Sequence, residues 1–453
     1  MHNTEYLGPE SSISKEIDEM KYRQKDESFD EKIKRISRTL SDDDEHRYKL
    51  EDILGNMRFL PAGRVQAAIG SNRITTAYNC FVSGVIEDNM NSIMEKASEA
   101  AETMRRGGGI GYDFSRIRPR GDKIKSLDSQ ASGPVSFMGI FDAVCQTIAS
   151  SGHRRGAQMG VLRVDHPDIE EFIMAKRNSD KLTGFNISVG ITDKFMEALT
   201  NDLDSSFTLE FQGKPYRTIC ARDLWDKIMD STWDWAEPGV LFIDRIGEMN
   251  NLYYCEDIFA TNPCGEQPLP PYGACLLGSF NLTKYLNEEQ IAGGEVAESH
   301  FEFDFKRFKS DIYEVVRAMD NVIDRTIYPL KKQADEAKDK RRMGLGVTGL
   351  ANAGELLGKP YASEDFMTWA EKVFACLRDT TYKASALLAK EKGAFPLYRE
   401  DYLKSNFVRG LPASVKKLIR EHGIRNSHLT SIAPTGTISL VADNVSGGIE
   451  PVF

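Results

Sequence analysis

The sequence predicts an α/β fold with a helical region at its N-terminus. Residues 13–57 are rich in charge and carry apolar side chains at roughly helical spacing, which indicates short amphipathic helices. Beyond them, short apolar segments broken by glycine alternate with helical patterns such as residues 91–105. We therefore divide the chain into an N-terminal helical region, residues 1–57, and an α/β body, residues 58–453.

The α/β body continues this alternation along its length. Strands are expected at residues 184–190, 207–211 and 241–244. Helices are expected at residues 168–177, 193–199 and 303–327, and residues 343–357 are expected to form a glycine-rich strand or turn that leads into a helix. Neither an internal repeat nor a long linker interrupts the pattern.

Composition excludes several classes of protein. The chain has 453 residues, of which 41% are hydrophobic, so it can bury a large core. Its net charge of −10 argues against nucleic-acid binding as its main role, although local basic clusters can still hold small anions. It lacks an apolar run long enough to span a bilayer and a signal-peptide core at its start, so we expect a cytoplasmic protein.

The cysteines argue for chemistry rather than for a disulfide framework. There are seven, an odd number scattered over a long chain, with neither a C-x-x-C pair nor an H-E-x-x-H motif. We therefore expect no protein-ligated metal. Most cysteines lie in apolar segments where a lone cysteine usually only fills the core; these are Cys80, Cys145, Cys220, Cys255 and Cys376.

The most informative segment is Asn262-Pro263-Cys264-Gly265-Glu266-Gln267-Pro268-Leu269. In an extended segment alternate side chains share a face, so Asn262, Cys264 and Glu266 are expected to point into one pocket. An amide, a thiol and a carboxylate in one pocket suit nucleophilic, radical or acid–base chemistry. A loop that happens to contain a buried cysteine is the open alternative. A second thiol, Cys275, follows eleven residues after Cys264.

Four other segments each allow two interpretations. The glycine run at residues 107–111 fits neither common nucleotide-loop motif, and a turn that lets a helix pack closely on a strand explains it as well. Two basic segments, residues 115–125 and 150–157, are anion-binding candidates or solvated faces. Residues 433–439 place hydroxyls around a glycine, which suits either a phosphate loop or a simple helix cap.

Taken together, these segments resemble the catalytic subunit of ribonucleotide reductase. The matching motifs, in chain order, are LPAGR (60–64), YNCFV (78–82), SGHRRGAQMG (151–160), NPCGEQPL (262–269), GACLLGSFNL (273–282), RRMGLGVTG (341–349) and APTGTIS (433–439). The N-P-C-G-E-Q form resembles the adenosylcobalamin-dependent class. The resemblance implies a ten-stranded α/β barrel, incomplete in this chain, and a homodimer.

The resemblance also implies the catalytic roles. Cys264 would carry a transient thiyl radical that removes the 3′ hydrogen of the substrate ribose. Glu266 would take the 3′-hydroxyl proton, and Asn262 would hold the sugar. Cys80 and Cys275 would be the dithiol that reduces the sugar and ends as a disulfide, which a thioredoxin-like protein would reduce again. Such a radical needs a dry pocket.

Binding roles follow from the same resemblance. A ribonucleoside di- or triphosphate would bind to Pro61, Ala62, Asn79, Pro434, Thr435, Gly436, Thr437, Ile438 and Ser439. A deoxynucleotide (dNTP) effector would bind across the dimer interface to Asp88, Arg118, Lys123, Ser151, Arg154 and Arg155, with Arg155 nearest the substrate.

Two departures from the family pattern bear on these expectations. The segment before Leu60 is too short for a regulatory N-terminal cone, and relatives continue well past the equivalent of Phe453. We therefore expect the N-terminal piece of a split, interrupted or shortened reductase, with a separate chain supplying the rest. The alternatives are the large subunit of an iron-dependent two-subunit reductase and a non-catalytic nucleotide-binding fragment.

Overall fold

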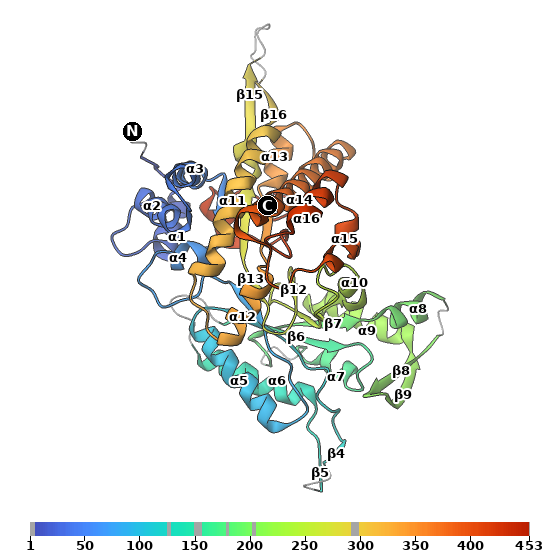
Figure 1. Cartoon of the computed structure of the whole chain (residues 1–453). Helices are drawn as coiled ribbons and strands as arrows, with labels where there is room; N and C mark the ends of the chain where they lie inside the picture. Colours follow the sequence, from blue (N-terminus) through green and yellow to red (C-terminus); the bar gives the residue numbers. More distant parts are fainter. Residues whose placement is uncertain are drawn as a thin grey trace.

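The computed structural model has the α/β architecture expected from the sequence (Figure 1). It describes residues 5–124, 128–148, 156–177, 181–201, 205–290 and 299–452. Helices were expected in residues 13–57, and three are found there: α1 (Ser12–Tyr22), α2 (Phe29–Leu40) and α3 (Asp44–Gly55). Their first turns are capped by the side chains of Ser11, Ser28 and Asp43, which accept hydrogen bonds from backbone N–H groups.

The larger sheet has the spatial strand order β10-β7-β6-β3-β2-β13 in the described part of the chain. The strands are β2 (Cys80–Val82), β3 (Gly109–Asp113), β6 (Gln158–Arg163), β7 (Phe185–Ile191), β10 (Gly239–Phe242) and β13 (Ala274–Cys275). The first five strands of the sheet are parallel, whereas β13 pairs antiparallel with β2. The parallel strands lie side by side in chain order, as in one half of an α/β barrel.

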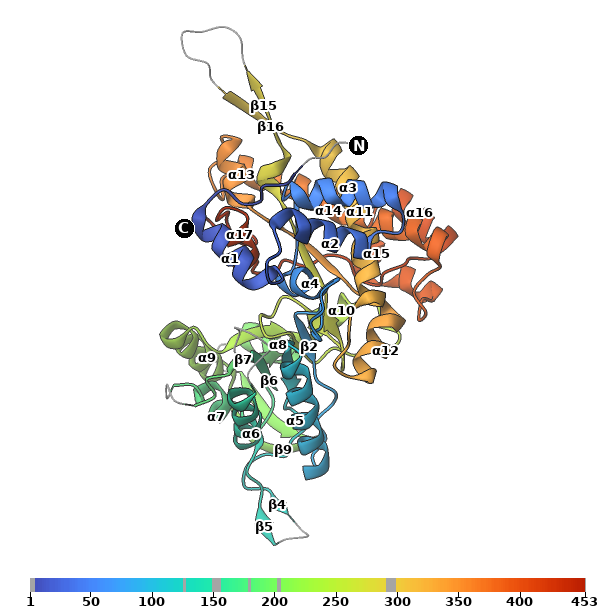
Figure 2. The ribbon, with the colours of Figure 1, turned by 90° about the vertical axis from the view of Figure 1, so that its left-hand side faces the viewer.

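Helices connect the parallel strands and cover one face of this sheet (Figure 2). They are α5 (Met90–Arg105) after β2, α6 (Pro134–Thr147) after β3, α7 (Ile169–Met174) after β6, and α8 (Asp193–Asn201) and α9 (Ala221–Trp235) after β7. Parallel strands require such crossovers because each connection must return to the same end of the sheet. The short helix α10 (Ile243–Glu248) follows β10.

The smaller sheet holds β1 (Phe59–Pro61), β14 (Leu277–Asn281) and β17 (Gly344–Thr348) in the order β1-β14-β17. β14 is antiparallel to β1 and parallel to β17. The long helices α11 (Phe305–Arg325) and α14 (Glu364–Lys392) pack against each other on this side of the molecule. An isolated parallel bridge joins Leu345 of β17 to Thr430.

Short elements complete the described chain. The further helices are α4 (Gly63–Ala68), α12 (Lys331–Lys340), α13 (Leu350–Leu356), α15 (Asn406–Arg409), α16 (Ala413–His422) and α17 (Gly436–Val441), with 3-10 turns at Leu282–Tyr285 and Glu400–Lys404. The further strands pair as β4 (Lys123–Ile124) with β5 (Ser129–Gln130), β8 (Ser206–Phe211) with β9 (Lys214–Cys220), β11 (Ala260–Thr261) with β12 (Pro268–Leu269), and β15 (Leu286–Gln290) with β16 (Ser299–Phe303).

The glycine run at residues 107–111 lets β11 and the turn that follows it approach the larger sheet closely. A Cβ on Gly111 would lie 1.8 Å from the backbone oxygen of Thr261, so β11 can lie on β3 only because Gly111 has no side chain. A Cβ on Gly109 would lie 3.0 Å from Pro263 and 3.2 Å from the Sγ of Cys80. These two glycines therefore have a packing role, but their close neighbours are β11, Pro263 and Cys80 rather than the helix expected from the sequence.

Most of the expected elements are present. The strands expected at 184–190 and 207–211 correspond to β7 and β8, and the helix expected at 303–327 corresponds to α11. The strand expected at 241–244 overlaps β10 only at residues 241–242, because Ile243 begins α10. The division of the chain at residue 57 remains a prediction. Ile33 of α2 and Leu50 of α3 belong to the same hydrophobic core as Phe81 of β2.

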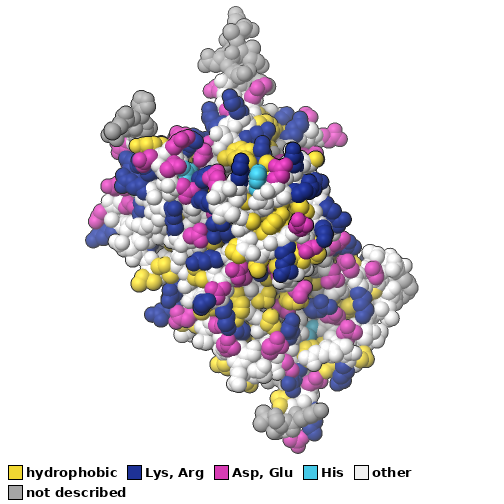
Figure 3. All heavy atoms as spheres, viewed as in Figure 1, with side chains coloured by type: hydrophobic (Ala, Val, Ile, Leu, Met, Phe, Trp, Pro, Cys, Tyr) yellow, Lys and Arg dark blue, Asp and Glu magenta, His cyan; other side chains and the backbone are white. Residues whose placement is uncertain are grey.

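The surface carries charges of both signs. In Figure 3, Lys and Arg side chains are interspersed with Asp and Glu over the face that is drawn. Among the helices of the described segments, none combines the length and the apolar character that crossing a membrane requires.

Candidate active site

Residues 262–267 form a turn between β11 and β12, so the extended conformation expected for Asn262, Cys264 and Glu266 is wrong. The N–H of Gly265 donates to the carbonyl oxygen of Asn262 at 3.0 Å, which closes a β-turn with Pro263 and Cys264 at its centre. Gly265 has a φ of +83°, in the left-handed region that glycine adopts readily. Proline and glycine at these positions favour a turn over a strand.

The turn nevertheless brings the amide and the carboxylate together. Nδ2 of Asn262 donates to Oε2 of Glu266 at 2.6 Å, and Oδ1 of Asn262 accepts from the backbone N–H of Gln267 at 2.9 Å. Asn262 is fully buried, so these hydrogen bonds determine how its side chain is oriented. The Glu266 carboxylate is thereby held beside the Cys264 turn.

Cys80 and Cys275 form a pair of facing thiols next to this turn. They are direct partners in the antiparallel register of β2 and β13, and neither is in a disulfide. Directly opposite residues of antiparallel strands have Cα atoms about 4.5 to 5.5 Å apart, within the range that a disulfide requires. The Sγ of Cys275 also lies 3.9 Å from Nδ2 of Asn262, which links the pair to the turn.

Burial and the neighbouring acidic groups shift the pKa of Cys275. Burial raises the pKa of the Cys275 thiol well above its usual range, and the charges of Glu266, Cys80 and Cys264 raise it further. Cys275 is therefore held as a protonated thiol, able to donate its proton. Cys264, in contrast, is exposed, so the described residues do not provide the dry surroundings that the resemblance implies for a radical site.

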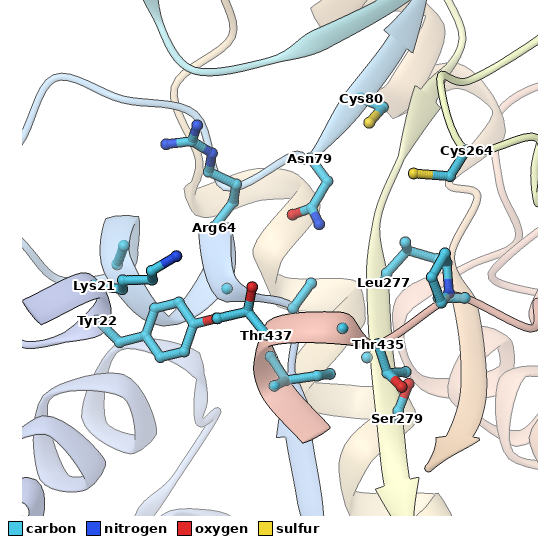
Figure 4. Close-up of a pocket in the computed structure, with 18 of the residues that line it drawn as sticks. Lys21, Tyr22, Arg64, Asn79, Cys80, Cys264, Leu277, Ser279, Thr435 and Thr437 are labelled. Atoms are coloured by element: carbon cyan, nitrogen blue, oxygen red, sulfur yellow. The ribbon is translucent and has the colours of Figure 1, made fainter. Parts of the chain in front are cut away.

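A cavity of about 670 Å³ opens beside these groups (Figure 4). The predicted residues that line it are Ala62, Asn79, Cys80, Cys264, Glu266, Pro434, Thr435, Gly436, Thr437 and Ile438. Asn262 and Cys275 are fully buried and are not among its lining residues. Pro61 and Ser439 are also absent from the lining, and their binding roles remain predictions.

The hydroxyls at the start of α17 differ in what they contact. The Thr435 Oγ1 accepts a hydrogen bond from the N–H of Gly448 at 2.9 Å, and the Ser439 Oγ donates to the Gly436 carbonyl at 3.0 Å. These two hydroxyls therefore stabilise the backbone around the start of α17. Thr437 lines the cavity, and in the described part of the chain its hydroxyl has no such internal hydrogen bond.

The cavity has a second wall that sequence reasoning missed. Lys21 and Tyr22 of α1, Arg64 of α4 and Arg73 also line it. Residues 13–57 were interpreted only as a helical cap, because a lysine on a charge-rich amphipathic helix has the signature of a solvated face. Only Arg64 carried a signal, as the last residue of the LPAGR motif.

The candidate effector residues are only partly described. Asp88 and Arg118 lie together, with an ion pair of 2.7 Å from Nε to Oδ2 and a hydrogen bond from the Arg118 N–H to Oδ1 at 3.1 Å. Lys123 lies in the β4–β5 hairpin and pairs with Asp128 at 2.9 Å. The other candidates, Ser151, Arg154 and Arg155, lie outside the described residues, and the effector role of all of them remains a prediction.

A metal centre made by side chains is not found in the segments that the structure describes. Within those segments, no group of three or more His, Cys, Asp or Glu side chains could hold a metal ion.

The family follows from comparison with known proteins. The sequence profile described as "Ribonucleotide reductase, barrel domain" matches residues 78–453, most of the chain. The chain belongs to the ribonucleotide reductase family. The half-barrel of parallel strands and the β-turn that carries Cys264 lie within the matched region.

Similar proteins are known from other organisms. The chain is 38% identical over 406 residues to a vitamin B12-dependent ribonucleoside-diphosphate reductase of Thermoplasma acidophilum, with 89% of this chain and 49% of the relative aligned. It is 39% identical over 402 residues to the protein of the same name in Mycobacterium tuberculosis strain CDC 1551, with 88% and 54% aligned. The chain thus spans about half the length of the curated relatives it matches.

A solved structure has the same fold. The Actinobacillus ureae class Id ribonucleotide reductase alpha subunit superposes on this chain with a TM-score of 0.77. The superposed region covers 99% of this chain and 76% of that subunit. The sequence identity is 22%, so this likeness concerns the fold alone.

Proposed function

We propose that this chain provides the reacting side chains for the reduction of ribonucleotides to 2′-deoxyribonucleotides, the precursors of DNA, by a thiyl-radical mechanism. The observation that carries the proposal is that Cys80, Cys264 and Glu266 line one pocket, while Cys275 lies buried directly opposite Cys80. Membership of the ribonucleotide reductase family supports the same reaction. A module that only bound nucleotides would not need three neighbouring thiols.

The groups have distinct roles in the proposed reaction. Cys264, as a thiyl radical, removes the 3′ hydrogen atom of the ribose, and Glu266 accepts the 3′-hydroxyl proton. Asn262, which is buried behind the cavity, orients Glu266 through its hydrogen bond, so the hold on the sugar expected of Asn262 would act through Glu266. The 2′ hydroxyl leaves as water with a proton from the Cys80–Cys275 dithiol.

The dithiol also balances the electrons. Cys80 and Cys275 give up two electrons and two protons in total, so the products are water, the deoxyribonucleotide and a Cys80–Cys275 disulfide. The hydrogen atom taken by Cys264 returns to the 3′ carbon. A thioredoxin-like reductant would then restore the dithiol for the next turnover.

Adenosylcobalamin is the proposed cofactor, because the similar proteins of Thermoplasma and Mycobacterium are named as vitamin B12-dependent. The site fits a bulky radical source, since the Cys264 thiol is exposed at the cavity and can be approached from outside. When bound, this cofactor supplies the one-electron oxidation of a thiol. Cys264 would provide that thiol.

The proposed substrate is a ribonucleoside di- or triphosphate, with its phosphates at Thr437 and its neighbours and its nucleoside near Ala62 and Asn79. The relatives named as diphosphate reductases favour the diphosphate. A dNTP effector bound near Asp88 and Arg118, at a homodimer interface, would select the base.

Further polypeptide is proposed to complete the barrel, either in one longer protein or as a separate chain. Two observations support it: the chain spans about half the length of its curated relatives, and Cys264 is exposed. The added polypeptide would cover Cys264 and exclude water from the radical site.

Turnover with a completed barrel tests the proposal. The chain, combined with the remaining barrel polypeptide, adenosylcobalamin, a dithiol and a ribonucleoside diphosphate, should form the deoxyribonucleotide. Cys264→Ala should abolish product while nucleotide binding is retained. Activity that requires a second, iron-containing subunit and ignores cobalamin would instead assign the chain to the two-subunit class.

A further inference from the structure

Helix α1 of the N-terminal region forms the wall of the cavity opposite the reacting thiols. Lys21 and Tyr22, its last two residues, line the cavity, and Figure 4 shows the Lys21 ammonium directed into the space on the side of Thr437. Cys264 lies on the other side of this view. Lys21 is half-buried and, among the described residues, forms no ion pair with a carboxylate.

Three hydrogen bonds hold the start of α1 against helix α17, which carries Thr437, and the residues after it. The backbone N–H groups of Glu10 and Ser11 donate to Oδ1 of Asp443 at 2.8 and 3.0 Å. The Ser14 hydroxyl donates to the carbonyl oxygen of Leu440, at the end of α17, at 2.6 Å. The start of α1 is therefore fixed to the end of α17 and the residues after it.

Apolar packing fixes the other end of α1. Tyr22 belongs to a small buried cluster with Leu60, Ile438 and Val441, which joins α1 to β1 and α17. A Cβ on Gly63 would lie 2.6 Å from the Tyr22 ring, so the ring rests directly on the backbone of α4. Lys21, next in the chain, is consequently held at a defined place beside α17.

A buried ion pair anchors α1 one turn before Lys21. Asp18 pairs with Lys32 of α2, and the two side chains are 0% and 1% exposed. The Lys32 ammonium also donates to Gln66 of α4 at 3.2 Å, and Gln66 donates to the carbonyl oxygen of Pro61 at 2.8 Å. Since both charges are buried and paired, rotation of α1 that removed Lys21 from the cavity would break this network.

The charges of the cavity differ between its two ends. Lys21, Arg64 and Arg73 are cationic lining residues, and Glu266 is an anionic one beside Cys264. Thr437 adds a hydroxyl on the Lys21 side. A ligand that carries a polyanionic group at one end and a neutral, polar group at the other matches this arrangement, and a nucleoside diphosphate has that form.

We propose that Lys21 is a substrate-binding residue that contacts the phosphate chain together with Thr437, so that the N-terminal region is part of the substrate site. Lys21 thereby favours nucleotides with two or more phosphates over the bare nucleoside. This inference rests on the proposed function. It assigns a specific binding contact to a region that sequence analysis regarded only as a cap.

Titration calorimetry with adenosine diphosphate and with adenosine tests the inference. Lys21→Gln should weaken binding of the diphosphate about tenfold, the usual size of one charge-assisted contact, and leave adenosine unaffected. Lys15→Gln is the matched control, because Lys15 is an exposed lysine on the same helix. Lys21→Arg keeps the charge and should retain most of the affinity.

The outcomes separate this inference from the function on which it rests. Weaker diphosphate binding in Lys21→Gln alone, with rescue by Lys21→Arg, supports the contact. Equal diphosphate affinity in the wild-type chain, Lys21→Gln and Lys15→Gln would overturn it while leaving the proposed function intact. If the wild-type chain binds adenosine no more weakly than the diphosphate, the cavity does not bind the phosphate groups. The proposed phosphate-binding role of Thr437 would then be wrong, and so would the inference about Lys21.

Discussion

Cys80 and Cys275 face each other directly across the antiparallel strands β2 and β13. The two residues are 195 positions apart in the sequence, and β13 lies at the edge of a sheet that is otherwise parallel in the described chain. This short antiparallel pairing is therefore what brings two distant cysteines face to face.

A disulfide between Cys80 and Cys275 should form without unfolding. Because facing residues already satisfy the Cα separation that a disulfide needs, mild oxidation should link this pair before any other. Peptide mapping by mass spectrometry after limited oxidation measures the linkage, and Cys80→Ser should remove it. A different pair formed first, such as one that includes Cys376, would contradict the strand register.

Thiol accessibility should distinguish Cys264 from Cys275. Cys264 is exposed, whereas Cys275 is fully buried and its pKa is raised. The thiolate is the species that reacts, so brief treatment with a maleimide should modify Cys264 and leave Cys275 unmodified until the protein unfolds. Mass spectrometry of peptides over a time course gives both rates, and equal rates would show that the site is not folded as described.

Gly111→Ala should destabilise the protein by about 3 kcal/mol, since the added methyl group would overlap the backbone of Thr261 and push β11 away from β3. Gly139→Ala is the matched control, because a Cβ at Gly139, within α6, meets nothing within 4 Å. That substitution should stabilise the helix by about 0.5 to 1 kcal/mol. Urea unfolding compares the two, and similar stabilities would contradict the close approach of β11.

His428 should make the protein sensitive to acid. Burial, then the positive charge of Arg342, lowers the pKa of His428 to about 3. The unfolded state therefore binds more protons below about pH 6.5, and stability falls as the pH decreases through that range, by up to about 1.4 kcal/mol per pH unit.

Replacing His428 by a residue that does not titrate isolates its contribution to the pH dependence of stability. In His428→Gln, the free energy of unfolding should change less steeply between about pH 6.5 and about pH 5 than in the wild-type chain. Urea unfolding at several pH values measures both slopes. Parallel slopes would mean that the pKa of His428 is the same in the folded and unfolded states.

Part of this architecture could be predicted from the sequence. Periodicity identified α11 and the strands β7 and β8, because their patterns are local. Asn262, Cys264 and Glu266 were singled out from their chemistry, whereas the roles of Cys80 and Cys275 were implied only by the family resemblance. The extended arrangement expected for the first three was wrong, since the positive φ of Gly265 turns the chain. Lys21 was missed because it reaches the cavity only through contacts of α1 with α17, far away in the sequence.

The most direct test of the account is a single turnover of the completed barrel with adenosylcobalamin and a ribonucleoside diphosphate, without external reductant. Deoxyribonucleotide and the Cys80–Cys275 disulfide should appear in equal amounts, and Cys264→Ala should give neither. Product formed by Cys264→Ala, or formed by the wild-type sites while Cys80 and Cys275 remain reduced, would contradict the proposed thiyl and dithiol roles.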